Sequence, residues 1–292
     1  MAWEVPVKES LAGVANSPFI KGGLEFLKYA LFHSGILSMP IQQSSLYVRS
    51  SALNKTGSKL IDITDQEAST KDVAITSLAQ DLIPDIELMP IAYSAMDNLE
   101  EHTRIYSKIG IFSSLATLTQ PKSNGTGRLT SSSPYDRPKV DFGILSNPED
   151  YVVARTAVRL SLTLAAAMKA AGFPLIRNLT FSQERQQKDV KNNNNEEIDK
   201  FIRQGIRSCY HWSSSCRMAP EEDVNTPGVV DDELRVYGVS GLRVCDTSVF
   251  PQITSGHLQA PAVMVAERCS DFILKELLLK GHEFRFKFLI ME

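Results

Sequence analysis

Hydrophobic and polar residues alternate along several short stretches of the chain, and this pattern predicts β-strands. Residues 85–90 alternate as a half-buried strand does, residues 111–118 form a second strand candidate, and residues 46–48 form a shorter one. Near the C-terminus, residues 242–245 follow the glycine-rich turn at 238–241, which predicts a short buried strand. The predicted strands are therefore spread over the whole chain.

Apolar residues spaced about 3.6 apart predict three helices. The clearest runs from Pro148 to Ala171, with Asn147 as its N-cap and Gly172 at its end. Its apolar, alanine-rich length indicates burial against a sheet. A second helix has Pro261 in its first turn and apolar positions up to Leu277. A shorter helix covers residues 24–32.

Other stretches predict loops. Residues 53–79 are polar, and residues 182–200 carry four consecutive asparagines with charges on both sides, which predicts a solvated loop that joins no core, before order resumes near Phe201. Gly125 and Gly127 give GxGxxT rather than the GxGxxG of a dinucleotide-binding loop. A strand is expected directly after them, so hairpin geometry is the better interpretation of these glycines.

Composition and charge narrow the class of protein. A chain of 292 residues with 43% hydrophobic and 22% charged residues suits one large or two modest globular domains. The net charge of −3 and the lack of a basic stripe give no indication of nucleic-acid binding. No apolar run has the length of a membrane span, and the first 50 residues lack the features of a secretory signal. We therefore expect no membrane partner, and the localisation stays open.

All four cysteines lie in the last third of the chain, at Cys209, Cys216, Cys245 and Cys269. Their spacing matches no common zinc pattern and contains no C-x2-C pair. We therefore expect buried free thiols rather than a metal site.

Two of the five histidines mark the stretch where we look for chemistry. His211 and His257 lie toward either end of residues 209–274, each beside small hydroxyl residues and close to a predicted turn. His257 and Gln259 precede the last predicted helix, and a helix N-terminus suits an anionic or electron-rich ligand. Histidine is also the side chain suited to remove a proton from a hydroxyl group near neutral pH. A lone histidine is more often an ordinary hydrogen-bonded residue, so both interpretations stand.

Three segments of this stretch resemble the C-terminal signature of the glucose-methanol-choline (GMC) family of flavin-dependent alcohol oxidoreductases. They are HWSSSCRMAP from residue 211, VVDDELRVYGVSGLRVCDTSVFP from residue 229 and SGHLQAPAVMVAER from residue 255. Residues 82–90, 121–129 and 138–151 are similar to landmarks of the family's substrate domain. The resemblance covers roughly residues 82–278, most of the chain.

The resemblance implies an α+β fold. An antiparallel substrate-domain sheet backed by helices would occupy residues 1–208, with residues 182–200 as a polar loop. Residues 209–280 would supply a strand and a helix that complete a Rossmann-like FAD domain, whose N-terminal half is absent from this chain. Residues 281–292 form a tail with no assigned role.

The resemblance also implies the chemistry: oxidation of a small alcohol to a carbonyl, with hydride transfer to FAD. His211 matches the general base, and His257 matches its partner, a position that holds His or Asn in relatives. The positions that match flavin contacts are Asp246, Thr247, His257, Leu258 and Gln259.

Several alternatives remain at this point. The chain departs from the family at Ser214 and Ser215, where Gly-Thr or Gly-Ser is common, so the backbone near His211 is expected to differ slightly. Asp246, Thr247, Leu258 and Gln259 also suit a strand-end cap and a helix-entry turn. A GMC-type hydroxynitrile lyase and a non-catalytic fragment or binding module that lacks the FAD half are the rival functions. The choice between oxidase and dehydrogenase is open.

Overall fold

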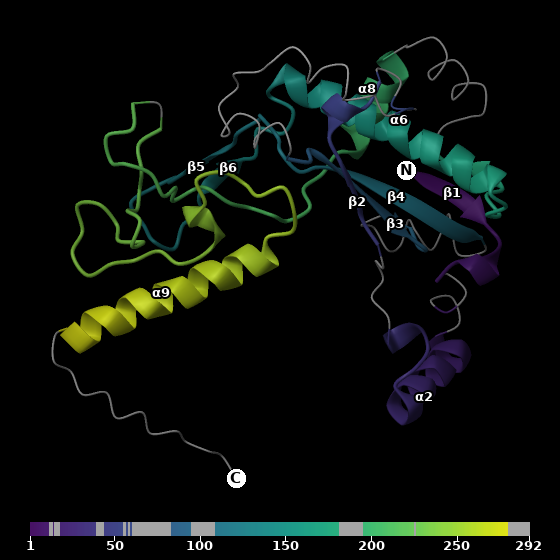
Figure 1. The fold of residues 1–292 in the computed structure, drawn as a ribbon, viewed down its shortest axis with the longest axis horizontal. Helices are drawn as coiled ribbons and strands as arrows, with labels where there is room; N and C mark the ends of the chain where they lie inside the picture. Colours follow the sequence, from purple (N-terminus) through teal and green to yellow (C-terminus); the bar gives the residue numbers. More distant parts are fainter. Residues whose placement is uncertain are drawn as a thin grey trace, which may run out of the picture. The chain divides into compact units, whose positions relative to one another are not determined.

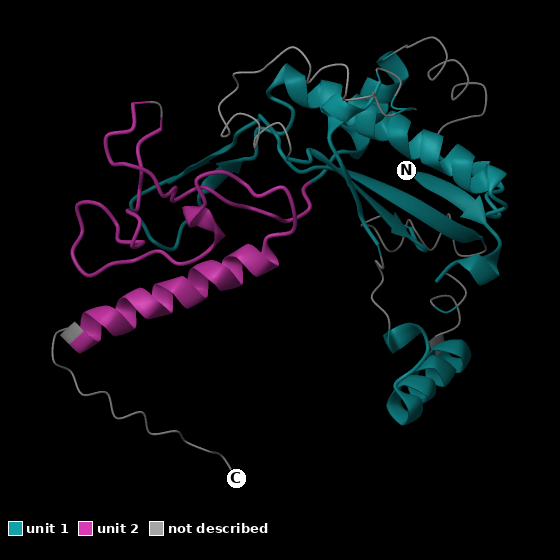
Figure 2. Ribbon diagram, viewed as in Figure 1, with its two compact units in different colours: residues 1–207 teal, residues 208–292 magenta. Residues whose placement is uncertain are grey.

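A computed structural model describes most of the chain in two compact units, residues 1–207 and residues 208–292 (Figure 2). The described residues are 1–11, 14, 18–38, 44–54, 57, 59, 83–94, 109–180, 195–224 and 226–279. The predicted polar segment at 53–79 lies largely outside them, as do residues 182–194 and the tail at 281–292.

A five-stranded sheet forms the centre of the first unit, in the order β2-β3-β4-β1-β7 (Figure 1). Every neighbouring pair is antiparallel. The strands are β1 (Ala2–Val5), β2 (Leu46–Val48), β3 (Ile86–Ile91), β4 (Gly110–Leu118) and β7 (Arg177–Asn178). The three strands predicted in this unit are therefore confirmed. Strand β3 is buried over its first four residues rather than on alternate positions, because side chains on both of its faces are covered.

Helix α6 (Pro148–Ala170) packs along this sheet (Figure 1). It begins as predicted: the side chain of Asn147 accepts a 2.9 Å hydrogen bond from the Glu149 N–H, and Pro148 occupies the first position. The apolar side of α6 forms one cluster with Trp3 and Phe112 and a second with Ile86 and Leu88. These two clusters are the core of the unit.

Helix α6 is long enough to span a membrane, although Arg155 and Arg159 interrupt its apolar residues. Among the described residues it is the one helix long and apolar enough to do so, judged by length and composition. Its apolar residues pack against the sheet, and this packing accounts for its composition.

Helix α8 (Glu196–Gly205) corrects the loop predicted up to residue 200. Ile198 and Ile202 lie one turn apart, are 0% and 5% exposed, and belong to the same core cluster as Trp3. Asp199 accepts two hydrogen bonds, of 2.6 and 2.7 Å, from the Arg155 guanidinium. The charged residues that predicted a solvated loop thus lie beside an apolar face, formed by Ile198 and Ile202, that packs against α6.

A hairpin of β5 (Thr126–Arg128) and β6 (Lys139–Asp141) follows the sheet. The glycines lie in and before β5 rather than in the turn, which spans residues 129–138. A Cβ atom on Gly125 would come within 2.3 Å of the Asp141 carbonyl oxygen, so glycine is required for this close approach. The remaining elements of the unit are α2 (Gly23–Phe32), η1 (Val7–Glu9), η2 (Pro18–Gly22), η3 (Ile36–Ser38) and η4 (Ser50–Ala52).

The second unit packs its loops on helix α9 (Gln259–Leu279), around a small apolar core. The core residues are Val230, Leu234, Val249, Phe250, Leu258 and Cys269. The predicted strand at 242–245 is an extended segment with one antiparallel bridge, between Arg243 and Arg235, rather than a buried strand. Leu242 is 48% exposed, so the segment is not buried as predicted.

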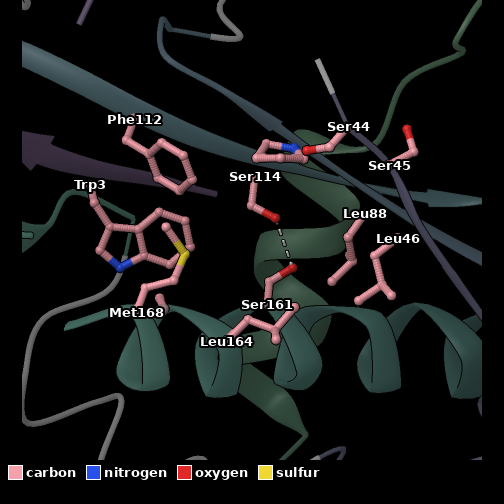
Figure 3. Close-up of a pocket in the computed structure, with 12 residues that line it drawn as sticks. Trp3, Ser44, Ser45, Leu46, Leu88, Phe112, Ser114, Ser161, Leu164 and Met168 are labelled. Atoms are coloured by element: carbon pink, nitrogen blue, oxygen red, sulfur yellow. Dashed lines mark hydrogen bonds between the residues drawn. The ribbon is translucent and has the colours of Figure 1, made fainter. Parts of the chain in front are cut away.

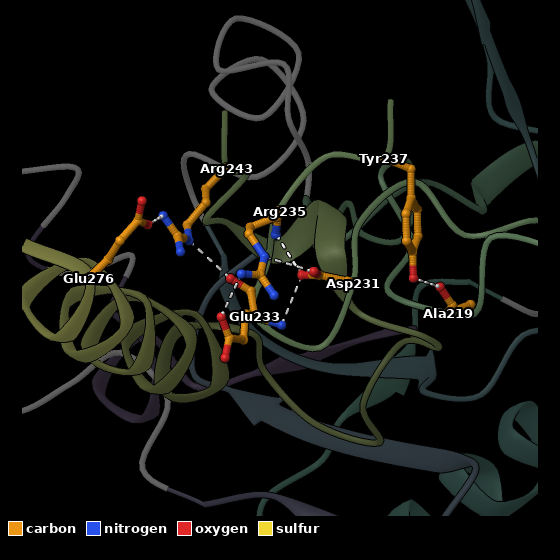
Figure 4. Close-up of polar contacts among 7 residues, drawn as sticks. All are labelled: Ala219, Asp231, Glu233, Arg235, Tyr237, Arg243 and Glu276. Atoms are coloured by element: carbon orange, nitrogen blue, oxygen red, sulfur yellow. Dashed lines mark hydrogen bonds and ion pairs between the residues drawn. The ribbon is translucent and has the colours of Figure 1, made fainter. Parts of the chain in front are cut away.

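Polar contacts fix the loops of this unit to each other and to α9 (Figure 4). One carboxylate oxygen of Asp231 accepts hydrogen bonds from the N–H groups of Glu233 and Arg235, and the other forms a 2.9 Å ion pair with the Arg235 guanidinium. Arg243 forms a 2.9 Å ion pair with Glu276 on α9 and donates to the Glu233 carbonyl. Burial raises the pKa of Asp231, but the hydrogen bonds from Arg235 and Glu233 outweigh it and hold that pKa below its ordinary value.

Candidate active site

His211 and His257, which are 46 residues apart in the sequence, are in direct contact. Nε2 of His211 lies 2.8 Å from Nδ1 of His257, and the two rings meet edge to face at 82°. At this distance one nitrogen donates and the other accepts, so the pair shares a single proton between these two atoms. Two N–H groups pointed at each other would repel. The arrangement therefore brings two ring nitrogens, each able to donate or accept a hydrogen bond, to one point of the site.

The segment that carries His211 runs alongside the segment that leads to His257. The N–H groups of Ser214, Cys216 and Met218 donate to three successive carbonyls, at 3.2, 2.9 and 2.8 Å. Those carbonyls belong to the 3-10 helix η5 (Thr247–Val249). The hydroxyl of Thr247 also donates a 2.7 Å hydrogen bond to the Trp212 carbonyl. These bonds fix the register between the two segments and thereby the position of His211.

The backbone beside His211 takes left-handed conformations at two residues. Ser214 has φ 68° and Tyr210 has φ 62°. A glycine adopts such angles at little cost, whereas other residues lose roughly 1–2 kcal/mol. The serine that departs from the family's common glycine thus occupies the conformation that favours glycine.

His257 is held by its neighbour Leu258. The Leu258 side chain is 4% exposed in the core of the second unit, and its carbonyl accepts the 2.9 Å hydrogen bond from the Ala262 N–H in the first turn of α9. This anchoring leaves the ring of His257 exposed and directed toward His211. Burial of Leu258 also means that only its backbone is available to a ligand.

The other residues matched to flavin contacts occupy different environments. Asp246 caps η5, because its carboxylate accepts a 2.7 Å hydrogen bond from the Ser248 N–H, and Thr247 joins the two segments. Gln259 is exposed at the start of α9. Both capping and helix entry, the structural roles expected from sequence, are thus observed for this set.

An open depression adjoins His257 at the N-terminus of α9. It is lined by His257, Gln259, Ala260 and Val263. Sequence reasoning did not identify Ala260 or Val263 as site residues. The signal was available in the spacing, since Gln259 and Val263 are one helical turn apart and lie on one face.

The cysteines are more exposed than expected. Cys209 and Cys245 are exposed, Cys216 is intermediate and Cys269 is buried, and all four are free thiols. Two effects contribute most to raising the pKa of the Cys245 thiol to about 11: desolvation by burial, which is the larger, and a hydrogen bond with Cys269. Within the described part of the chain, no group of three or more His, Cys, Asp or Glu side chains is placed to hold a metal ion.

The side chain of Trp212, next to His211, is 45% exposed. Arg217 and Arg243 each form an ion pair. Arg217 lies 3.4 Å from Asp223, and Arg243 pairs with Glu276.

Comparison with protein-family models shows which family contains this site. The model described as GMC oxidoreductase, for the C-terminal region, matches residues 121–266, which are half of the chain. The chain belongs to the GMC oxidoreductase family. The matched range includes the histidine pair, and the cofactor of the family is FAD.

Curated relatives of this GMC chain are considerably longer than it is. An oxygen-dependent choline dehydrogenase from Vibrio vulnificus (strain YJ016) is 37% identical over 155 residues, which are 53% of this chain and 26% of that protein. One from Sinorhizobium medicae (strain WSM419) is 41% identical over 153 residues, or 52% of this chain and 26% of that protein. The chain thus matches about a quarter of these relatives.

Solved structures share the fold. The formate oxidase of Aspergillus oryzae RIB40 matches 94% of this chain and 45% of its own, with a TM-score of 0.71 and 21% sequence identity. At this identity the likeness establishes the α+β architecture alone. It agrees with the predicted fold class, and the chain matches less than half of that structure.

Proposed function

We propose that this chain is the substrate-side and C-terminal portion of an FAD-dependent GMC enzyme that oxidises a primary or secondary alcohol to a carbonyl compound. The observation that carries the proposal is the 2.8 Å contact between Nε2 of His211 and Nδ1 of His257. Membership of an oxidoreductase family and the choline dehydrogenase relatives support the reaction class.

The two histidines have distinct roles in this proposal. When an alcohol binds, its oxygen lies between the rings of His211 and His257 and replaces their direct contact. It gives its proton to Nε2 of His211, which is the general base, and accepts a hydrogen bond from His257, which holds the oxygen in place. Loss of that proton makes departure of the carbinol hydride easier. When bound, FAD supplies the acceptor for this hydride.

The residues beside His257 fit the edge and face of a flavin ring. Ala260 is small and Val263 is apolar, so they leave room for a flat ring to lie against the first turn of α9. The N–H groups of that turn suit its electron-rich edge. Asp246, Thr247, Leu258 and Gln259 would act here by their backbone or polar groups. The rest of FAD would require the nucleotide-binding half that the family resemblance implies.

The test uses an enzyme that contains this chain together with a nucleotide-binding half. Under anaerobic conditions, a substrate alcohol is expected to bleach the visible absorption of the bound flavin, and an alcohol deuterated at the carbinol carbon should do so more slowly. Replacing His211 with Asn should lower the rate of bleaching by about 10²–10⁴-fold. His257→Asn should lower it less, because Asn keeps a hydrogen-bonding group.

His33 offers a matched control, because it ends helix α2 in a left-handed conformation that Asn also tolerates. His33→Asn should leave the rate unchanged. Turnover of a cyanohydrin without bleaching would assign the site to a lyase. A chain that retains no flavin even with the nucleotide-binding half would leave only the role of a non-catalytic module.

A further inference from the structure

We propose that the first unit contains a second small-molecule site, a cavity between the sheet and α6 that takes a neutral, mainly apolar ring compound with a single hydroxyl or carbonyl group (Figure 3). All of its lining residues belong to the unit of residues 1–207, whereas His211 and His257 belong to the other unit. The proposal therefore does not depend on the proposed oxidation.

The walls of the cavity are apolar and partly aromatic. In Figure 3, Trp3, Phe112 and Met168 gather on one side, and Leu46 and Leu88 lie on the other. Aromatic rings and a thioether favour contact with another ring, because such pairs gain energy beyond the area they bury. An elongated ring compound would therefore place its ring toward Trp3 and Phe112.

A pair of serine hydroxyls forms a polar point between the two apolar ends, and Ser44 and Ser45 also line the cavity. The hydroxyls of Ser114 on β4 and Ser161 on α6 are 3.2 Å apart, and Ser161 is only 1% exposed. Two hydroxyls carry two donor hydrogens, and their mutual bond uses one. The pair can therefore donate one further hydrogen bond and accept others. A hydroxyl or carbonyl group on the ligand matches this capacity.

The size and charge of the cavity define the ligand further. Its volume of about 260 Å³ compares with the roughly 150 Å³ of an engineered apolar cavity that binds benzene, so it suits about ten non-hydrogen atoms. Among the residues that the structure describes, those lining the cavity include no charged side chain. A charged ligand would lose its hydration without gaining a partner, and the site therefore selects neutral compounds.

The probe is 2-phenylethanol, with ethylbenzene as its analogue without the hydroxyl, titrated into the 292-residue chain by calorimetry. We expect saturable binding of both. Ala165→Met on α6 places a longer side chain in the cavity and should weaken binding of both at least tenfold. Ala166→Met makes the same change at the next, exposed position of the helix and should have no effect. Ser161→Ala should weaken 2-phenylethanol about fivefold and leave ethylbenzene unchanged.

Two further measurements keep the proposal falsifiable if Ala165→Met fails to fold. The chain has two tryptophans, so Trp212→Phe leaves Trp3 as the only one, and its fluorescence should change along the same binding curve as the heat. The double variant His211→Asn with His257→Asn should bind both probes as the parent chain does. Three results would overturn the proposal. Neither probe binds saturably, the fluorescence of Trp3 does not change when the probe is added, or the histidine double variant no longer binds the probes.

Discussion

The hydroxyl of Thr247 donates a 2.7 Å hydrogen bond to the carbonyl of Trp212, the residue that follows His211. This one side chain joins the segment that carries the first histidine to the segment that leads to the second. Thr247 was matched to a flavin contact, and the structure gives it this positioning contact as well. A positioning residue affects catalysis only through the placement of other residues. Loss of the Thr247 hydrogen bond should therefore lower the stability of the second unit, which can be measured without following any reaction.

Thr247→Val should lower the free energy of unfolding of the second unit by about 1 kcal/mol, because it removes a hydrogen bond to a backbone carbonyl while keeping the size of the side chain. Thr247→Ser keeps the hydroxyl and should cost less. Urea denaturation followed by circular dichroism measures both. A larger loss in Thr247→Ser than in Thr247→Val would show that the methyl group, not the hydroxyl, stabilises the unit.

Ser214→Gly should raise the stability of the second unit by up to about 1 kcal/mol. At φ 68° the serine is in the left-handed region, and glycine relieves that strain, although the greater freedom of glycine in the unfolded chain offsets part of the gain. Ser213→Gly is the control, since Ser213 is not among the residues with positive φ, and it should destabilise slightly. Thermal unfolding of the two variants in parallel distinguishes them. A lower melting temperature for Ser214→Gly would contradict the strain argument.

Acid should weaken the attachment of α8 through Asp199. The hydrogen bond from the Arg155 guanidinium holds the pKa of Asp199 below its ordinary value. A depressed pKa contributes stability that is present above the unfolded-state pKa, at about 4, and is lost as the pH falls through the folded-state pKa. Unfolding measured between pH 7 and pH 3 should therefore show this loss below about pH 4.

Asp199→Asn should remove that part of the pH dependence and lower stability at pH 7 by about 1–2 kcal/mol, because it breaks a two-point charged contact. Asp136→Asn changes the same residue type at an exposed position of the first unit and should retain the parent profile. An unchanged acid profile in Asp199→Asn would refute the assignment.

Ile202→Ala should destabilise the first unit by about 2–4 kcal/mol, since the side chain is 5% exposed in the core. Ile20→Ala makes the same change at a position that is 73% exposed and should change stability by less than about 0.5 kcal/mol. Chemical denaturation provides both values. A small effect at Ile202 would contradict the packing of α8 in this core.

Local patterns in the sequence were enough for the elements whose causes are local. Asn147 and Pro148 predicted the start of α6, because capping and proline geometry act within one helical turn. Alternation predicted β3 and β4, since neighbouring side chains of a strand point to opposite faces. The loop prediction failed at residues 196–200, where α8 begins, because asparagine and charge content outweighed Ile198, whose burial requires a partner helix.

The sequence by itself determined the family signature, the main helices and strands, and the two histidines as candidates for chemistry. Only the tertiary structure decided that His211 Nε2 and His257 Nδ1 lie 2.8 Å apart, that Leu258 is buried while His257 is exposed, and that Ser114 and Ser161 meet inside a cavity. Each of these contacts joins residues far apart in the chain or depends on what covers a side chain. Such contacts depend on tertiary packing, and the pattern within a short stretch of sequence does not predict that packing.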